Sequence, residues 1–270
     1  MQTLVAICYQ NVNQLLLSRN EVQLALFVRA SAFTALISAL ITPITNALKP
    51  RLEYVFSRDR AQYENYICNC FDCILCVLLP VIFGMVALSE NITLIFGGEQ
   101  FASGAQVLAV CCICAFSSQI ATFLNTIIST PAGFEKNTFW SNSVVACVAI
   151  IANPILVWKL GALGAAFALL IAETCGLIVH LILVKKHHLY IGWISPKKSK
   201  YLSSALLMFC AVMVVKHFVS NIYLQCVACI PFGALTYGLF VMIFTKIFRD
   251  ANPYILQVVF RNMRQEKLEK

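Results

Sequence analysis

Eight long apolar runs follow one another along the 270 residues of the chain. A membrane-spanning helix needs about 20 mostly apolar residues. The runs cover residues 1–18, 22–48, 63–88, 102–128, 137–158, 161–184, 201–219 and 222–248. In lipid the backbone must satisfy its own hydrogen bonds, and barrel strands alternate over about ten residues, so runs of this kind indicate helices. The sequence therefore predicts an all-α polytopic membrane protein with about eight transmembrane helices.

The composition agrees with a membrane protein. Hydrophobic residues make up 60% of the chain and charged residues 12%, whereas a soluble domain carries about 25% charged residues. A chain of this size in water also needs a polar surface, which these proportions do not supply. The 13 cysteines lie mostly inside apolar runs, which argues against a secreted disulfide scaffold.

The net charge of +8 is explained by membrane topology, and no nucleic-acid partner is predicted. If the amino terminus is cytoplasmic, most of the 20 basic residues fall in cytoplasmic segments, as the positive-inside rule requires. Those segments are 49–62, the loop with Lys136, 185–200 and the tail 249–270. We expect 49–62 to lie along the membrane surface as an amphipathic linker. We expect an even number of spans with both ends cytoplasmic.

Three charged residues lie inside predicted spans, where a charge is costly and suggests function. Arg29 either reaches toward the headgroups at its end of the helix or binds an anion in a wet cavity. Asp72 is either a cation or proton site or a carboxylate close to water. Glu173 either faces a cavity or hydrogen-bonds a neighbouring helix. Asp72 and Glu173 are the candidates for ion coupling.

Several other motifs favour structural roles. The four cysteines of CNCFDCILC (68–76) fan around a helix, so no metal site is expected. Small residues at helical spacing between Gly161 and Gly176 indicate close helix packing. Three prolines inside predicted spans are candidates to kink or break them, namely Pro43, Pro80 and Pro154. Asn91 begins a formal glycosylation sequon, NIT, in a predicted outer loop.

Three stretches resemble a known family. They are EVQLALFVRASAF (21–33), LIFGGEQFASGAQVLAV (94–110), and the region 125–186 with its GFEK turn, NPIL, GALGAA and AE. These motifs resemble the polysaccharide or O-antigen flippases (Wzx type) of the multidrug/oligosaccharidyl-lipid/polysaccharide exporter superfamily. The resemblance implies a transporter fold of about 14 helices in two lobes plus a terminal pair. This chain would correspond to its carboxy-terminal part.

On that resemblance, residues 1–184 form the second-lobe bundle and 185–200 a basic cytoplasmic loop. Residues 201–248 form the terminal helix pair and 249–270 a basic cytoplasmic tail. The first lobe would be missing, so the chain is expected to be a fragment, a split protein or the product of a disrupted gene. Because alternating access needs two lobes, we expect no transport by this chain alone.

The resemblance also implies a function without enzymatic activity and without a cofactor. Such flippases move an undecaprenyl-pyrophosphate oligosaccharide across the bacterial inner membrane. Arg29 would contribute to a cationic substrate cavity. Polar residues that either bind sugars or join helices are Asn11, Asn13, Gln14, Gln119 and Asn125.

Other functions remain open at this point. One alternative is a drug or small-molecule antiporter, or a lipid II flippase, of the same superfamily. Another is a membrane polymerase or acyltransferase of sugar assembly, which predicts a large outer loop with Arg or His clusters. The sequence contains no outer loop of that kind.

Overall fold

The computed structural model describes residues 11–56, 58, 60–187, 198–219 and 221–247, and those residues contain no strand. A helix over residues 11–17 comes first. The long helices are α2 (Glu21–Phe56), α3 (Arg60–Ala87), α5 (Gly104–Phe123), α6 (Glu135–Leu160), α7 (Ala162–Lys186), α8 (Ser199–Phe218) and α9 (Ile222–Ile247). Shorter elements are α4 (Ser89–Gly97), the 3-10 turn Glu99–Phe101 and the π-helix Leu124–Ser129.

Seven helices of the described chain are long and apolar enough to cross a membrane. They coincide with the second to eighth predicted runs, so the all-α, multi-pass prediction is confirmed. Large apolar side chains point outward, including Trp158 at 86% exposure and Val227 at 71%, as expected for a lipid-facing surface. Part of the first run, residues 1–10, and the tail from 248 lie outside the described residues.

The linker prediction for 49–62 is wrong over its first half. Residues 49–56 continue α2, which is 36 residues long and contains Pro43 and Pro50. None of the three prolines named from the sequence breaks its helix, because α2, α3 and α6 each run through their proline. Membrane helices tolerate proline where neighbouring groups satisfy the freed carbonyl.

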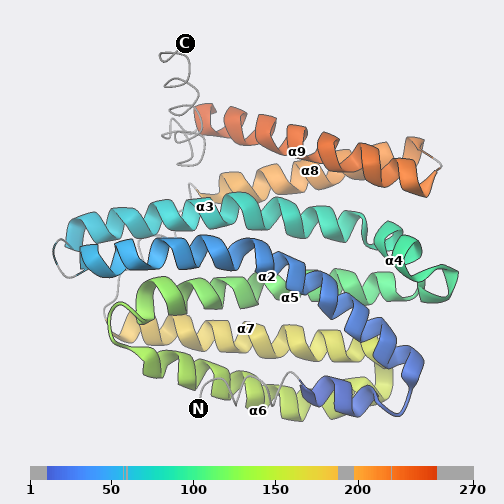
Figure 1. The fold of residues 1–270 in the computed structure, drawn as a ribbon, viewed down its shortest axis with the longest axis horizontal. Helices are drawn as coiled ribbons and strands as arrows, with labels where there is room; N and C mark the ends of the chain where they lie inside the picture. Colours follow the sequence, from blue (N-terminus) through green and yellow to red (C-terminus); the bar gives the residue numbers. More distant parts are fainter. Residues whose placement is uncertain (1–10, 57, 59, 188–197, 220, 248–270) are drawn as a thin grey trace.

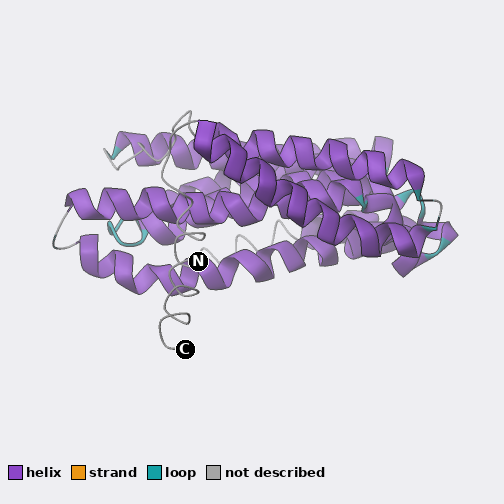
Figure 2. Cartoon of the chain, turned by 90° about the horizontal axis from the view of Figure 1, so that it is seen from above, coloured by secondary structure: helices purple, strands orange, loops and turns teal. Residues whose placement is uncertain are grey.

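The helices form a long bundle whose turns collect at two ends (Figures 1 and 2). We call them the α4 end, which also holds the α6–α7 and α8–α9 turns, and the α2–α3 end. Helix α3 lies between the α8–α9 pair on one side and α2 and α5 on the other. Helices α7 and α6 complete the far side of the bundle (Figure 1), where α7 packs against both α5 and α6.

Small residues bring α6 and α7 together. Ala165, Ala168 and Ala172 on α7 are fully buried. A Cβ built on Gly164 would overlap the carbonyl oxygen of Leu156 on α6, so only glycine fits there. The predicted packing role of this small-residue stripe is confirmed.

Candidate functional site

A polar cavity of about 310 Å³ lies between the helix of residues 11–17, α2, α5 and α7. Its polar lining consists of Asn13, Gln14, Ser31, Thr34, Ser38, Ser118, Gln119 and Glu173. Apolar side chains complete the wall, namely Phe27, Ala35, Cys111, Cys114, Ala115 and Leu169. The cavity thus presents hydroxyls, amides and one carboxyl group inside a bundle whose outer surface faces lipid.

Asn13 is the residue of this cavity with the most unsatisfied hydrogen-bonding groups. Its side chain is 1% exposed, and neither the amide nitrogen nor the amide oxygen has a hydrogen-bond partner. A buried polar group left unsatisfied costs about 1–3 kcal/mol, and buried groups in folded proteins are nearly always paired. The chain bears this cost at a position that lines a cavity, which points to a partner supplied by a ligand or by bound water.

Gln119 presents a second free acceptor to the same space. Its Nε2 donates to Ser38 Oγ at 2.7 Å, which ties α5 to α2 and fixes the orientation of the amide. Its Oε1 is buried and unpartnered, with the residue 4% exposed. Asn13 and Gln119 together offer one amide donor and two amide acceptors, an arrangement suited to sugar hydroxyls, which both donate and accept.

Glu173 forms the acidic part of the wall. It lies on α7, is 9% exposed, and faces the cavity beside Cys114 on α5. The lining residues include no lysine, arginine or histidine. As far as the described residues form it, this cavity is neutral to acidic and differs from the cationic cavity expected from the sequence.

Arg29 lies outside the polar cavity, at the α4 end. Its Nη1 donates to the carbonyl oxygen of Phe96 at 3.2 Å, and its guanidinium lies 4.0 Å from the centre of the Phe101 ring. The side chain is otherwise exposed. Arg29 thus connects α2 to the carboxyl end of α4, where the negative end of the helix dipole stabilises a cation.

Two of the predicted sugar-binding residues also lie away from this cavity. Asn125, in the π-helix, accepts a short hydrogen bond from Thr138 of α6, the interhelical role that the sequence left open. Asn11 is exposed on the helix of residues 11–17 and is not part of the lining. The structure therefore brings Asn13, Gln14, Gln119 and Glu173 together, and places Arg29, Asn11, Asn125 and Asp72 elsewhere.

Asp72 forms an ion pair that the sequence did not predict. Lys198 Nζ lies 2.7 Å from Asp72 Oδ1 and 3.0 Å from the carbonyl oxygen of Cys68. The two side chains are 24% and 12% exposed. The contact joins α3 to the start of α8 across 126 positions of sequence. No local pattern indicated this pairing.

A second, apolar cavity of about 680 Å³ lies between α3, α4, α8 and α9. Its lining is carbon- and sulfur-rich, with Tyr237 as the sole residue bearing a hydroxyl. The lining includes Pro80, Gly84, Ile92, Met208, Val212, Cys229, Ile230 and Gly233. Sequence analysis did not identify it, because each lining residue looks like an ordinary lipid-facing or core side chain in its own helix.

Another polar pair that the sequence analysis missed lies where α5 meets α7. Ser129 Oγ, at the end of the π-helix, is 3.0 Å from His180 Nε2, and both residues are at most 1% exposed. Histidine at a helical position within an apolar run was the available signal. π-helices are frequent at functional sites, but here the pair is closed off and lines neither cavity.

Two comparisons with known proteins find similarities to this chain. Residues 1–106 match the family described as Polysaccharide biosynthesis protein. The solved structure of the lipid II flippase MurJ, in an inward closed conformation, superposes with a TM-score of 0.77 at 20% sequence identity. The chain has the fold of this flippase. The match covers 92% of this chain and 53% of the MurJ chain, so the chain spans about half the length of that structure.

These findings confirm the predicted resemblance to polysaccharide and lipid-linked flippases of the exporter superfamily. A search of the curated proteins finds no match by sequence. The structural match shows the fold, and the family match carries the description of polysaccharide biosynthesis.

Proposed function

We propose that the chain is the carboxy-terminal part of a flippase for a lipid-linked oligosaccharide, and that its polar cavity holds sugars of the cargo. The observation that carries this proposal is the pair of buried, unpartnered amide groups on Asn13 and Gln119. Sugar hydroxyls satisfy such groups without requiring charge. A cavity of about 310 Å³ has room for part of an oligosaccharide rather than all of it.

The other parts of the cargo need different surroundings. A polyprenyl chain is compatible with lipid and with the apolar cavity at α3, α8 and α9. The pyrophosphate needs a cation, and Arg29 remains our candidate because one of its nitrogens donates to Phe96 while the guanidinium carries five N–H donors in all. Gln14 is exposed at the rim of the polar cavity, where it is available to further sugars.

Transport by this route requires a second lobe, because alternating access needs two bundles moving about a shared site. The match to 53% of the MurJ chain is consistent with this chain supplying one of them.

We further propose that the cargo is an O-antigen repeat on undecaprenyl pyrophosphate, and that the membrane is the bacterial inner membrane. Both chain ends would be cytoplasmic, which places the α2–α3 end on that side. No enzymatic step is involved.

Ion coupling is proposed through Glu173 rather than Asp72. Glu173 is a buried carboxyl group in the wall of the proposed sugar site, so a change in its charge alters the cavity directly. Asp72 is instead paired with Lys198 outside that cavity.

Binding to the purified chain in lipid nanodiscs tests the proposal. The ligands are undecaprenyl-pyrophosphate-linked disaccharide and undecaprenyl pyrophosphate without sugar. The chain should bind the glycosylated lipid more tightly, and Asn13→Leu should remove that preference. Asn153→Leu is the matched control, because Asn153 is also fully buried with both side-chain groups unpartnered but does not line the cavity. Equal binding of the two lipids by the unmodified chain would refute a sugar site.

Lipid II transport is the second candidate, favoured by the similarity to the MurJ structure. The two candidates differ in the glycan. Competition between lipid II and an O-antigen-type lipid-linked repeat for the same nanodisc sample separates them, because the preferred cargo displaces the other at lower concentration.

A further inference from the structure

A cleft of about 900 Å³ opens on the surface of the bundle at the α4 end, away from the polar and apolar cavities. We call it the α2–α6 cleft, because it lies between the helix of residues 11–17, the start of α2 and the end of α6. Its lining comes from residues 15–23 on one side and 154–161 on the other. It shares no lining residue with either cavity, so any ligand that it holds is bound independently of them.

The α2–α6 cleft has an apolar wall and a polar rim. The wall includes Leu15, which is 74% exposed, and Trp158, which is 86% exposed. The rim includes Arg19 and Asn20, in the turn between residues 17 and 21. Because the α4 end is one end of the membrane-spanning helices, the rim lies at the headgroup level of a bilayer, where tryptophan is enriched. A molecule with a polar headgroup and a hydrocarbon chain fits both parts.

The polar rim presents mainly hydrogen-bond donors, because its amide oxygens are already engaged. Asn20 Oδ1 accepts from the backbone nitrogen of Gln23 at 3.3 Å, and Gln23 Oε1 accepts from the backbone nitrogen of Ala162 at 2.8 Å. A backbone N–H bonds only to an acceptor, so both contacts fix the amide oxygen and leave the amide nitrogen as a donor. Gly161, with φ of 58°, permits the second contact, since a Cβ there would lie 2.5 Å from Gln23 Oε1. Together with the Arg19 guanidinium, these groups suit a ligand rich in acceptors.

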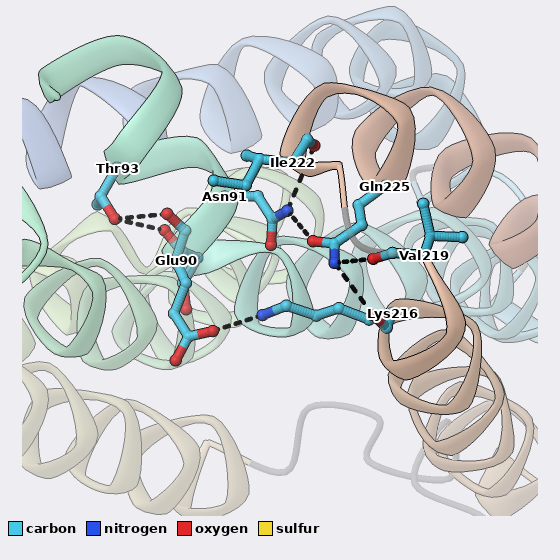
Figure 3. A network of polar contacts seen from close by, with 8 residues as sticks. Glu90, Asn91, Thr93, Lys216, Val219, Ile222 and Gln225 are labelled. Carbon is cyan, nitrogen blue, oxygen red and sulfur yellow. Dashed lines mark hydrogen bonds and ion pairs between the residues drawn. The ribbon is translucent and has the colours of Figure 1, made fainter. Parts of the chain in front are cut away.

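Two other cations at the α4 end are held by protein groups. Lys216 Nζ, near the end of α8, lies 2.5 Å from Glu90 Oε2 on α4. The amides of Asn91 and Gln225 bond to each other beside this ion pair (Figure 3). Arg29 donates to a backbone carbonyl of α4. Neither Lys216 nor Arg29 lines the α2–α6 cleft.

Arg19 and Lys159, by contrast, flank the cleft with uncommitted charges. Arg19 is part of the lining, and Lys159 lies between the lining residues Trp158 and Leu160. Both cations are exposed, and neither forms an ion pair with another described residue. The lining includes no carboxylate, although Glu21 is exposed at the start of α2. The cleft thus combines positive charge and N–H donors with an apolar wall.

We infer that the α2–α6 cleft binds an anionic phospholipid from the leaflet at the α4 end. Arg19 and Lys159 hold its phosphate, since cations near a membrane surface attract anionic lipid. The amide nitrogens of Asn20 and Gln23 donate to the phosphate oxygens, and an acyl chain lies along the apolar wall beside Trp158. The site is separate from both cavities, so the inference holds whatever cargo the protein carries.

Quenching of Trp158 fluorescence by brominated phospholipids tests this site, because bromine on an acyl chain quenches an indole that it contacts. Trp140→Phe and Trp193→Phe leave Trp158 as the reporter in the full chain, which is placed in nanodiscs. Brominated phosphatidylglycerol is mixed with plain phosphatidylcholine, and the reverse, so that the two curves give a relative association constant. Phosphatidylglycerol should be preferred about tenfold, because each of the two cations contributes about fivefold and Glu21 opposes them.

Neutral variants of the two cations should weaken that preference. Arg19→Gln and Lys159→Gln should each lower it about fivefold, whereas Arg19→Lys should keep most of it because the charge remains. Lys216→Gln is the matched control, since it removes a cation at the same end that is paired with Glu90 outside the cleft. Its quenching curves should match those of the reporter chain.

Two additions to the nanodiscs distinguish the sources of the phosphate. Inorganic phosphate should relieve quenching by brominated phosphatidylglycerol no more than sodium chloride of equal ionic strength does, because the apolar wall adds affinity only for a lipid. Undecaprenyl pyrophosphate should relieve it at mole fractions similar to those of unlabelled phosphatidylglycerol.

Four results would overturn the inference. Two are equal association constants for the two phospholipids and a preference that persists in both Arg19→Gln and Lys159→Gln. The third is relief of quenching specific to inorganic phosphate, which would indicate a site for the free anion. The fourth is relief by undecaprenyl pyrophosphate at mole fractions more than about tenfold lower than those of phosphatidylglycerol. That last result would assign the cleft to the pyrophosphate of the cargo.

Discussion

The polar cavity and the apolar cavity of this protein lie in one bundle and are built on opposite principles. The polar cavity places buried amides and a carboxyl group among α2, α5 and α7. The apolar cavity is larger, and α3, α4, α8 and α9 line it almost entirely with hydrocarbon. A cargo with a sugar head and a lipid tail needs both kinds of surrounding.

The two cavities also differ in how their linings affect the stability of the fold. The polar cavity leaves amide groups unsatisfied, which lowers stability in the absence of a ligand. In the apolar cavity the lining has few polar atoms, so the empty cavity leaves few polar groups unpaired. Substitutions should therefore affect one cavity without affecting the other.

The largest effect is expected from Gly164→Ala. It should disturb the packing of α7, which lines the polar cavity and not the apolar cavity. The new Cβ overlaps the Leu156 carbonyl of α6, and a backbone atom cannot move aside as a flexible side chain can. We expect a loss of about 3 kcal/mol in the free energy of unfolding, at the upper end for overpacking. Chemical denaturation in detergent measures it.

Gly238→Ala on α9 provides the control for that substitution, since a Cβ there meets nothing within 4 Å. Its unfolding free energy should stay near that of the unmodified chain. Equal stability of the two variants would mean that α6 and α7 do not pack as closely as described.

Asn13→Leu is expected to have opposite effects on stability and binding. It removes two buried unpartnered groups, so the unfolding free energy should rise by about 1–3 kcal/mol. Affinity for a lipid-linked disaccharide should fall about thirtyfold, the effect of losing two hydrogen bonds of about 1 kcal/mol each. A variant that is more stable and still binds the lipid-linked disaccharide normally would show that Asn13 does not bind the sugar.

Gly233→Leu is the corresponding change in the apolar cavity. A Cβ at Gly233 would lie 3.3 Å from Val212 Cγ2, and a longer side chain extends into the space that we propose for the polyprenyl chain. Photolabelling of residues 226–237 by a diazirine-bearing polyprenyl phosphate should fall about tenfold, equivalent to roughly two fewer buried methylene groups. Gly238→Leu serves as the control, and glycan-dependent binding should persist in both.

The smallest effect concerns the sequon at Asn91. Expression in a eukaryotic cell should leave Asn91 unmodified, because its side chain is 2% exposed and donates to Gln225. Thr93→Ala, which destroys the sequon, should therefore leave electrophoretic mobility unchanged. A glycosidase-sensitive shift that disappears in Thr93→Ala would show that Asn91 is accessible and contradict its burial against α9.

The fold was largely predictable from the sequence because apolar run length directly reports membrane spans. The extension of α2 through Pro50 to Phe56 was not, since a proline beside basic residues also suits a surface linker. Helix α4 was also missed. Its nine residues are too short for a span, and Gly98, with φ of 75°, ends it at a turn.

The candidate site was predictable only in part. Asn13, Gln14, Gln119 and Glu173 were recognisable as polar residues in apolar runs, and the structure places them around one cavity. The sequence could not distinguish them from Asn125, which is also a polar residue in an apolar run but contacts Thr138 instead of the cavity. The partners of Asp72 and Asn91 lie more than 100 positions away, so no local pattern indicates them.

The most direct test of the two-cavity account uses one lipid-linked oligosaccharide carrying a diazirine either on a sugar or near the end of its polyprenyl chain. After photolysis in nanodiscs, the sugar probe should label α2, α5 and α7, and the lipid probe should label α3, α8 and α9. The two patterns should respond separately to Asn13→Leu and Gly233→Leu. Labelling of the same helices by both probes, or of the α8–α9 wall by the sugar probe, would contradict the assignment of one cavity to each end of the cargo.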